Sequence, residues 1–141
     1  KVIMIDKFTD KYRFLSNFYL SDVKIDKYTF PSVEHAYQAM KFKESEWHIF
    51  TDRNLSPGKA KRLGRKGELP NKWISKRIEV MEKLLRAKFN NPELMAMLVA
   101  TGNTPLVEGN TWEGTFCGKC DGKGRNHLGR LLMKIRDEQK I

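Results

Sequence analysis

The longest regular pattern in the chain is a stripe of apolar residues that recurs every three or four positions over residues 73–89. Its members are Ile74, Ile78, Met81, Leu85 and Phe89. Because this spacing matches the turn of an α-helix, it predicts one long amphipathic helix with the stripe facing a core. This is the strongest helix signal in the chain of 141 residues.

Capping signals predict four further helices. A Ser or Asn precedes each of them, and in the second Pro57 occupies the first helical position. They cover residues 33–42, 57–63, 92–100 and the segment after 126, with Ser32, Ser56, Asn91 and Asn126 as caps. In the last helix, the apolar side chains recur at helical spacing and should be buried.

The strand signals are short. Apolar residues alternate on both sides of Asp26-Lys27 and predict a hairpin over residues 23–30, and residues 2–5 and 106–107 are expected to form short strands. Residues 14–19 lack a period, and residues 109–125 contain five glycines, so both are expected to be loops. The predicted fold class is α+β: a compact, mostly helical single domain over residues 1–141 with a few short strands.

Composition excludes several classes of protein. Hydrophobic content is 40% and charged content 31%, and no apolar run approaches the roughly 20 residues that span a membrane. Residues 1–6 are charged too early for a signal peptide, and two cysteines make no disulfide framework, so we expect a cytoplasmic protein. The net charge of +10 suits a polyanionic partner, although charge alone favours the simpler explanation of a solvated basic surface.

Two residues, Glu34 and Lys61, could take part in catalysis, but each also has an ordinary structural explanation. Glu34 lies in the first turn of a predicted helix, where a carboxylate normally offsets the helix dipole, and it shares a face with Gln38 four residues later. Lys61 lies among other cations that would normally form a solvated face. Lysines in such surroundings can also act as nucleophiles toward carbonyl carbon.

The glycine-rich segment of residues 122–125 allows two interpretations. Its backbone N–H groups and cations, at the start of the helix after Asn126, could cradle a phosphate, or the glycines could only provide backbone freedom. Cys117 and Cys120 form a C-x-x-C, but zinc prefers four ligands and only His127 lies nearby in sequence. We therefore expect two reduced thiols, no metal and no other cofactor.

Taken together, these segments resemble the NADAR family, also called YbiA-like proteins. The resemblance rests on the order and spacing of residues 14–19, 33–39, 60–65, 106–112 and 126–133, with Trp73 between them. It implies a mostly helical α+β domain that cleaves N-glycosidic bonds. Family members act on ribosylamino-pyrimidine phosphates of riboflavin synthesis or remove ADP-ribose from guanine in nucleic acid. The implied partner is a ribosyl-phosphate or ADP-ribosyl small molecule, or a modified nucleic acid, and no membrane.

The resemblance also implies roles for single residues. Lys61 would trap the anomeric carbon as an imine, and Glu34 would hold ribose hydroxyls or assist proton transfer. The implied binding residues are of three kinds: the aromatic Phe18, Tyr37, Trp73 and Trp112, the amides Asn17 and Asn110, and the phosphate ligands Arg62, Arg65 and Asn126.

One segment departs from the family. Where the family usually has Trp-His-Asp and, two residues later, Trp-Gly, this chain has Trp112-Glu113-Gly114 and Cys117-Gly118. Three alternatives follow: Glu113 supplies the missing carboxylate from one position earlier, the substrate has changed, or the chain binds ADP-ribose-like nucleotides without turnover. A plain nucleic-acid-binding domain is a further rival, and the sequence does not indicate an oligomeric state.

Overall fold

The computed structural model describes residues 3–108 and 126–140. It divides the chain into two units, one of residues 17–88 and one of residues 1–16 with 89–141. The predicted α+β class is confirmed, since the described residues form helices and one two-stranded sheet. None of the helices within these ranges is long and apolar enough to cross a membrane.

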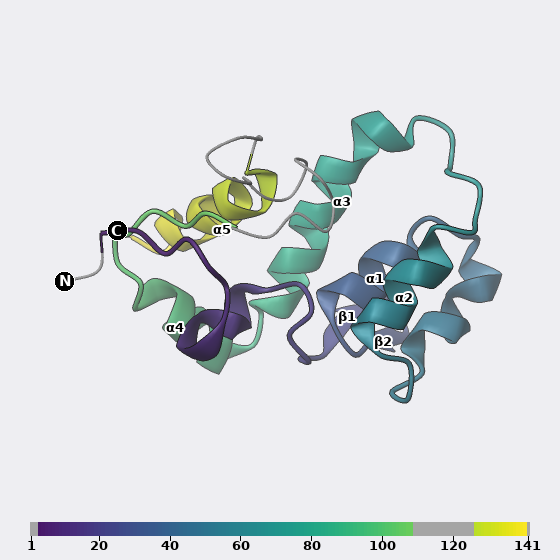
Figure 1. The fold of residues 1–141 in the computed structure, drawn as a ribbon, viewed down its shortest axis with the longest axis horizontal. Helices are drawn as coiled ribbons and strands as arrows, with labels where there is room; N and C mark the ends of the chain where they lie inside the picture. Colours follow the sequence, from purple (N-terminus) through teal and green to yellow (C-terminus); the bar gives the residue numbers. More distant parts are fainter. Residues whose placement is uncertain (1–2, 109–125, 141) are drawn as a thin grey trace. The chain divides into compact units, whose positions relative to one another are not determined.

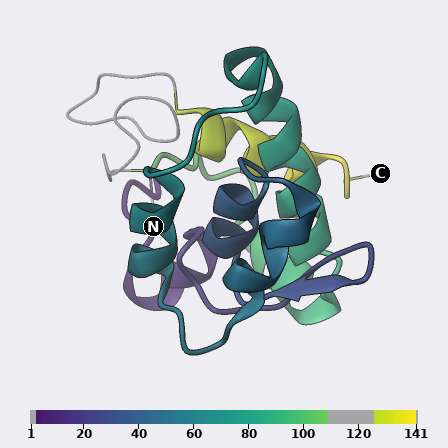
Figure 2. The ribbon, with the colours of Figure 1, turned by 90° about the vertical axis from the view of Figure 1, so that its right-hand side faces the viewer.

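In the unit of residues 17–88, the predicted hairpin is confirmed. The strands β1 (Val23–Ile25) and β2 (Tyr28–Phe30) pair antiparallel, with Val23 opposite Phe30, and run side by side in Figure 2. Asp26 makes the turn with a φ of 54°, a conformation that Asp tolerates better than most residues. The hairpin packs through β2 against the 3₁₀ helix η2 (Glu44–Thr51), which the sequence did not indicate.

The helix α1 (Val33–Ala39) is the most enclosed element of this unit. It packs against η2, α2 (Pro57–Gly64) and α3 (Trp73–Lys88), and Figure 1 shows α2 alongside it. All seven α1 residues are buried, polar ones included. The helix ends three residues earlier than predicted because Phe42 N–H bonds the Ala39 carbonyl at 2.9 Å, a tight turn that stops the α-helical ladder.

Helix α3 has the predicted extent, but part of its predicted buried stripe is wrong. Ile74 is 64% exposed and Ile78 is 38% exposed. The other three predicted residues, Met81, Leu85 and Phe89, are buried, and so are Trp73, Leu84 and Lys88. At 100° per residue, the buried face is turned by roughly 50° from the predicted stripe. Contacts with α1 and β1, not the apolar period alone, therefore decide which side of α3 is covered.

The other unit contains the 3₁₀ helix η1 (Asp10–Leu15) and the predicted helices α4 (Pro92–Val99) and α5 (His127–Asp137). The two strands expected at residues 2–5 and 106–107 are wrong for the described residues, which form only a single parallel bridge between Ile5 and Leu106. Val107 N–H donates to the Ile5 carbonyl at 2.8 Å, and Ile5 N–H donates to the Pro105 carbonyl at 2.9 Å. Such a short pairing does not form a ladder.

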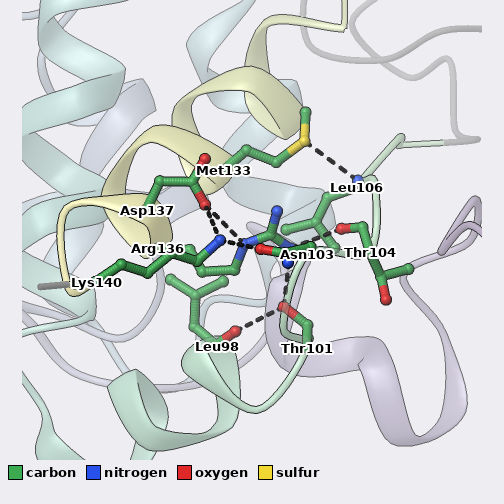
Figure 3. A network of polar contacts seen from close by, with 9 residues as sticks. All are labelled: Leu98, Thr101, Asn103, Thr104, Leu106, Met133, Arg136, Asp137 and Lys140. Carbon is green, nitrogen blue, oxygen red and sulfur yellow. Dashed lines mark hydrogen bonds and ion pairs between the residues drawn. The ribbon is translucent and has the colours of Figure 1, made fainter.

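Arg136 of α5 holds the segment that follows α4. Its guanidinium is buried and donates to the Thr104 carbonyl at 2.6 Å and to Thr101 Oγ1 at 3.1 Å (Figure 3). Lys140 contacts Asn103 and Asp137 near the end of the same helix. These contacts fix residues 101–104 against α5, because a buried guanidinium must have its donors satisfied.

The expected capping of α5 by Asn126 is wrong. Asn126 precedes the helix, but its φ of 52° is left-handed and its side chain makes no cap hydrogen bond. Its amide instead donates to the Leu106 carbonyl at 2.9 Å and accepts from Glu108 N–H at 3.1 Å. Gly129 permits this close approach, since a Cβ there would lie 2.2 Å from the Leu106 carbonyl oxygen.

Candidate active site

The N-terminus of α1 is fixed by Ser32 and His35. Ser32 Oγ accepts from His35 N–H at 3.1 Å, as the sequence predicted for a cap. His35 Nε2 lies 2.6 Å from the Leu55 carbonyl, which can only accept, so Nε2 carries the proton. Nδ1 then accepts from the Ser32 hydroxyl at 2.7 Å. Both ring nitrogens of this neutral histidine are used structurally.

Glu34 follows directly and is fully buried. Its carboxylate accepts from Gln38 Nε2 at 2.6 Å, and its backbone N–H donates to the Asn17 carbonyl at 3.0 Å. A buried carboxylate is unfavourable unless hydrogen bonds and charges compensate it. The sequence placed Glu34 and Gln38 on one helix face, and the structure joins them there.

Asn17, whose backbone carbonyl bonds the Glu34 N–H, carries a second buried amide. Its side chain is fully buried and donates from Nδ2 to Met81 Sδ at 3.5 Å, a weak acceptor. Within the described part of the chain, Asn17 Oδ1 has no hydrogen-bond partner. We call Asn17, Glu34 and Gln38 the Glu34 cluster. It offers a carboxylate and an amide oxygen, both of which suit the hydroxyl groups of a sugar.

Tyr37, one turn further along α1, forms an aromatic pair with Trp73 at the start of α3. The rings of Tyr37 and Trp73 have centroids 5.4 Å apart, tilted by 56°, and both side chains are buried. Lys41 Nζ lies 5.4 Å from the Tyr37 centroid and 6.0 Å from the Trp73 centroid. The structure thus brings together two of the four predicted aromatic binding residues and adds a cation, Lys41, that was not predicted.

A surface depression adjoins this aromatic pair through Lys41. It encloses about 500 Å³ and its lining residues are Lys41, Phe42, Lys43, Glu46 and residues 67–70. Phe18, the third predicted aromatic residue, is half-buried beside Asn17 in the sequence.

Helix α2 carries the predicted cations. Its buried residues are Ala60 and Gly64, and Lys61 is half-buried beside them, three residues before Gly64. Residues three and four apart share a helix face, so Lys61 flanks the side of α2 that packs on α1. Arg62 and Arg65 are exposed, which leaves their guanidinium groups accessible to a phosphate.

Lys88 is a buried ionisable side chain that the sequence analysis missed. It lies in the last turn of α3 with its Nζ 5.6 Å from the Tyr19 ring centroid. Burial lowers the pKa of Lys88 from 10.5 to about 7. Helical spacing could have identified it, because Met81, Leu84, Leu85 and Lys88 recur at the positions of one buried face.

The remaining predicted site residues belong to the other unit or lie outside the described residues. Asn126 is buried, with its amide bonded to Leu106 and Glu108 as above. Asn110, Trp112 and Glu113 lie outside the described residues, as do Gly114 and the two cysteines. Among residues 3–108 and 126–140, there is no group of three His, Cys, Asp or Glu side chains that could hold a metal.

The neutral state of His35 gives a testable pH dependence. Burial lowers its pKa, more than the Leu55 carbonyl and Asp52 raise it. Below pH 6.5, the unfolded chain therefore takes up a proton that the folded protein resists, so the free energy of unfolding should fall as the pH falls from 7 to 5. Urea unfolding across this range should show a weaker fall in His35→Gln than in the wild type. The exposed-histidine variant His48→Gln should keep the wild-type slope, and an unchanged slope in His35→Gln would contradict the assignment.

The chain is similar to known proteins over nearly its whole length. The NADAR domain matches residues 5–140. The N-glycosidase YbiA of Escherichia coli K12 is 39% identical over 136 residues, which cover 94% of this chain and 85% of that protein. The N-glycosidase YbiA of Shigella boydii has the same identity and coverage. A riboflavin biosynthesis protein of Vibrio vulnificus is 36% identical over 132 residues, 92% of this chain and 36% of that longer protein.

The fold agrees as well. The solution NMR structure of the E. coli protein YbiA superimposes with a TM-score of 0.82 at 39% sequence identity, covering 96% of this chain and 84% of that one. The similarity therefore extends over both units and over each segment on which the resemblance rested. The chain belongs to the NADAR family.

Proposed function

We propose that this protein is an N-glycosidase that cleaves the bond between a ribosyl group and a nitrogen base. The substrate class is an ADP-ribosylated base, such as ADP-ribosyl-guanine in nucleic acid, or a ribosylamino-pyrimidine phosphate. Relatives named N-glycosidase that cover nearly the whole chain support the reaction type. The observation that carries the proposal is Glu34, a fully buried carboxylate held by the Gln38 amide.

The reaction requires a negative charge near the sugar. Breaking the bond between the anomeric carbon and the base nitrogen develops oxocarbenium-like positive charge on the ribose. A carboxylate fixed in a water-poor environment stabilises such a charge strongly and needs no reorganisation as the bond breaks. We assign this role to Glu34. We assign to Asn17 Oδ1, a buried acceptor of the residue whose backbone carbonyl bonds the Glu34 N–H, a hydrogen bond from a ribose hydroxyl.

We assign Lys61 as the nucleophile. Its neutral amine forms a bond to the anomeric carbon while the bond to the base breaks, and the electron pair leaves with the base nitrogen. The proton that the amine loses balances the proton that the base gains, and Glu34 relays it. The ribosylamine then opens to an imine, and water hydrolyses the imine to the free sugar and Lys61.

We assign binding of the rest of the substrate to the aromatic pair and to the exposed Arg62 and Arg65. The Tyr37 and Trp73 rings with Lys41 form a wall against which a base or ribose packs. Arg62 and Arg65 meet phosphate oxygens, since an exposed guanidinium binds them in a bidentate manner. Roles for Phe18, Asn110, Trp112, Glu113 and Asn126 stay predictions of the family resemblance.

The rival is a protein that holds ADP-ribose without turnover, favoured by Gly114 in place of the family aspartate. Product analysis separates the two. The purified protein is incubated with ADP-ribosylated guanine DNA and, separately, with ribosylamino-pyrimidine phosphates, and released base is quantified by mass spectrometry. We expect base release from one of the two. No released base from either, together with calorimetric binding of ADP-ribose, would overturn the enzyme and support the binder.

A further inference from the structure

We propose that Gln38 is a positioning residue for Glu34 and that Gly64 exists to give its amide room. The inference rests on the proposed function, because it assigns a second residue to the chemistry of the same carboxylate. Nothing in the sequence pattern singles out Gly64, which could have been only the end of a helix. The inference rests on the positions of Glu34 and Gln38 on α1 and of Gly64 on α2.

The first step is the bond between Gln38 and Glu34. The two side chains follow one another at four residues on α1, are each at most 1% exposed, and meet at 2.6 Å between Nε2 and Oε2. A hydrogen bond to a charged acceptor is short and strong, and burial strengthens it further. Because the last torsion of a glutamate has no sharp rotamer preference, this bond helps to set the plane of the carboxylate.

The second step is the isolation of the Gln38 amide. Among the described residues, its side chain makes no hydrogen bond other than the one to Glu34, and its Oε1 has no partner although it is buried. A buried amide oxygen without a partner is unfavourable, because it has lost its hydrogen bonds to water. A glutamine that only filled space would be replaced favourably by Met or Leu. What glutamine does here, and Met or Leu could not do, is orient the Glu34 carboxylate.

The third step is Gly64. A Cβ built on Gly64 would lie 1.7 Å from Gln38 Oε1 and 2.5 Å from its Cδ, so the amide occupies the space of the missing side chain. Any side chain at residue 64 would push the Gln38 amide away from its place beside Glu34. Gly58, near the start of the same helix, has room for a Cβ, which would make only an ordinary contact with an Arg62 nitrogen at 3.9 Å.

The Gln38 variants test the positioning role directly. Gln38→Met keeps the volume and removes the donor, so we expect kcat to fall about 10–100-fold with KM within twofold, as for other residues that orient a reactive group. Gln38→Glu keeps the shape and donates only when protonated. Its kcat should be at least as low as that of Gln38→Met at pH 8 and should recover as the pH falls toward 5, where the carboxyl pair shares a proton. A residue needed only for packing would not give this pH-dependent recovery.

The glycine pair supplies the matched control. Both Gly→Ala changes add the same methyl group to α2, and alanine favours the helix in each case. Gly64→Ala should lower kcat to the level of Gln38→Met, whereas Gly58→Ala should keep the wild-type kcat. Thermal unfolding of each variant shows whether it folds, and Gln38→Met carries the test if Gly64→Ala does not. Wild-type kcat in Gln38→Met would overturn the proposal.

Crystal structures of Gln38→Met and of the wild type separate this inference from the proposed function. We expect the Glu34 carboxylate to turn away from its wild-type orientation in the variant. If the wild type releases no base but the carboxylate turns, the proposed function fails and the positioning contact stands. If the wild type is active, and Gln38→Met keeps both the wild-type orientation of the carboxylate and the wild-type kcat, the positioning role fails and the proposed function stands.

Discussion

Replacing Glu34 by glutamine is expected to lower kcat for base release by about 10³-fold, the size of effect seen when a preorganised electrostatic group is removed from an active site. The change keeps the volume and removes the charge that opposes the oxocarbenium ion. KM should change little, because the charge acts mainly in the transition state. Single-turnover base release, measured by mass spectrometry, gives the rate constant of bond cleavage without a contribution from product release.

Glu79→Gln is the matched control for this prediction. Glu79 is an exposed carboxylate on α3, and its loss removes the same net charge from the same unit. It should retain the wild-type rate. If the rate of base release by Glu34→Gln stays within tenfold of the wild type while both variants remain folded, the buried carboxylate is not catalytic. Glu113 is then the next candidate for the catalytic carboxylate.

Lys88 should give the largest stability effect. With its folded pKa near 7 and an unfolded value near 10.5, the unfolded chain binds a proton over this range that the folded protein releases. The free energy of unfolding should therefore rise with pH from 7 to 10, by about 4 kcal/mol in total at about 1.4 kcal/mol per pKa unit. Lys88→Met should remove this rise, because methionine fits an apolar site without a charge.

Denaturant unfolding at pH 7, 8.5 and 10 measures the effect. Lys83→Met provides the comparison, since Lys83 is an exposed lysine on the same helix and its replacement should leave the pH dependence unchanged. Parallel curves for the wild type and Lys88→Met would show that Lys88 stays charged in the folded protein, contrary to the burial argument.

Local signals in the sequence predict the elements well and their packing less well. Ser32 and Asn91 cap the helices that they were expected to cap, because a side-chain oxygen before a helix has few other partners. Asn126 follows the same pattern, yet its amide bonds Leu106 and Glu108, which lie about 20 residues away in sequence. The exposure of Ile74 has the same origin, since neighbouring elements decide which face of α3 is covered.

The candidate site was predictable in part for the same reason. Glu34 and Gln38 were assigned to one face of a single helix, which needs only the helical period. The contact of Gln38 with Gly64 joins two helices and could not be read from spacing. Lys88 could have been found from its place on the buried face, where a lysine is unusual. The single-domain organisation, the cytoplasmic location and the roles of Asn110, Trp112 and Glu113 stay predictions.

The most direct test of the central claim is reductive trapping at Lys61. Borohydride added while the wild-type protein turns over its substrate reduces an imine to a stable amine and leaves a sugar on the lysine. Peptide mapping by mass spectrometry should find this adduct on Lys61, and Lys61→Arg, which keeps the charge without a usable nucleophile, should give none. An active preparation that yields no adduct, or an adduct on Lys88 instead, would contradict the assignment of Lys61 as the nucleophile.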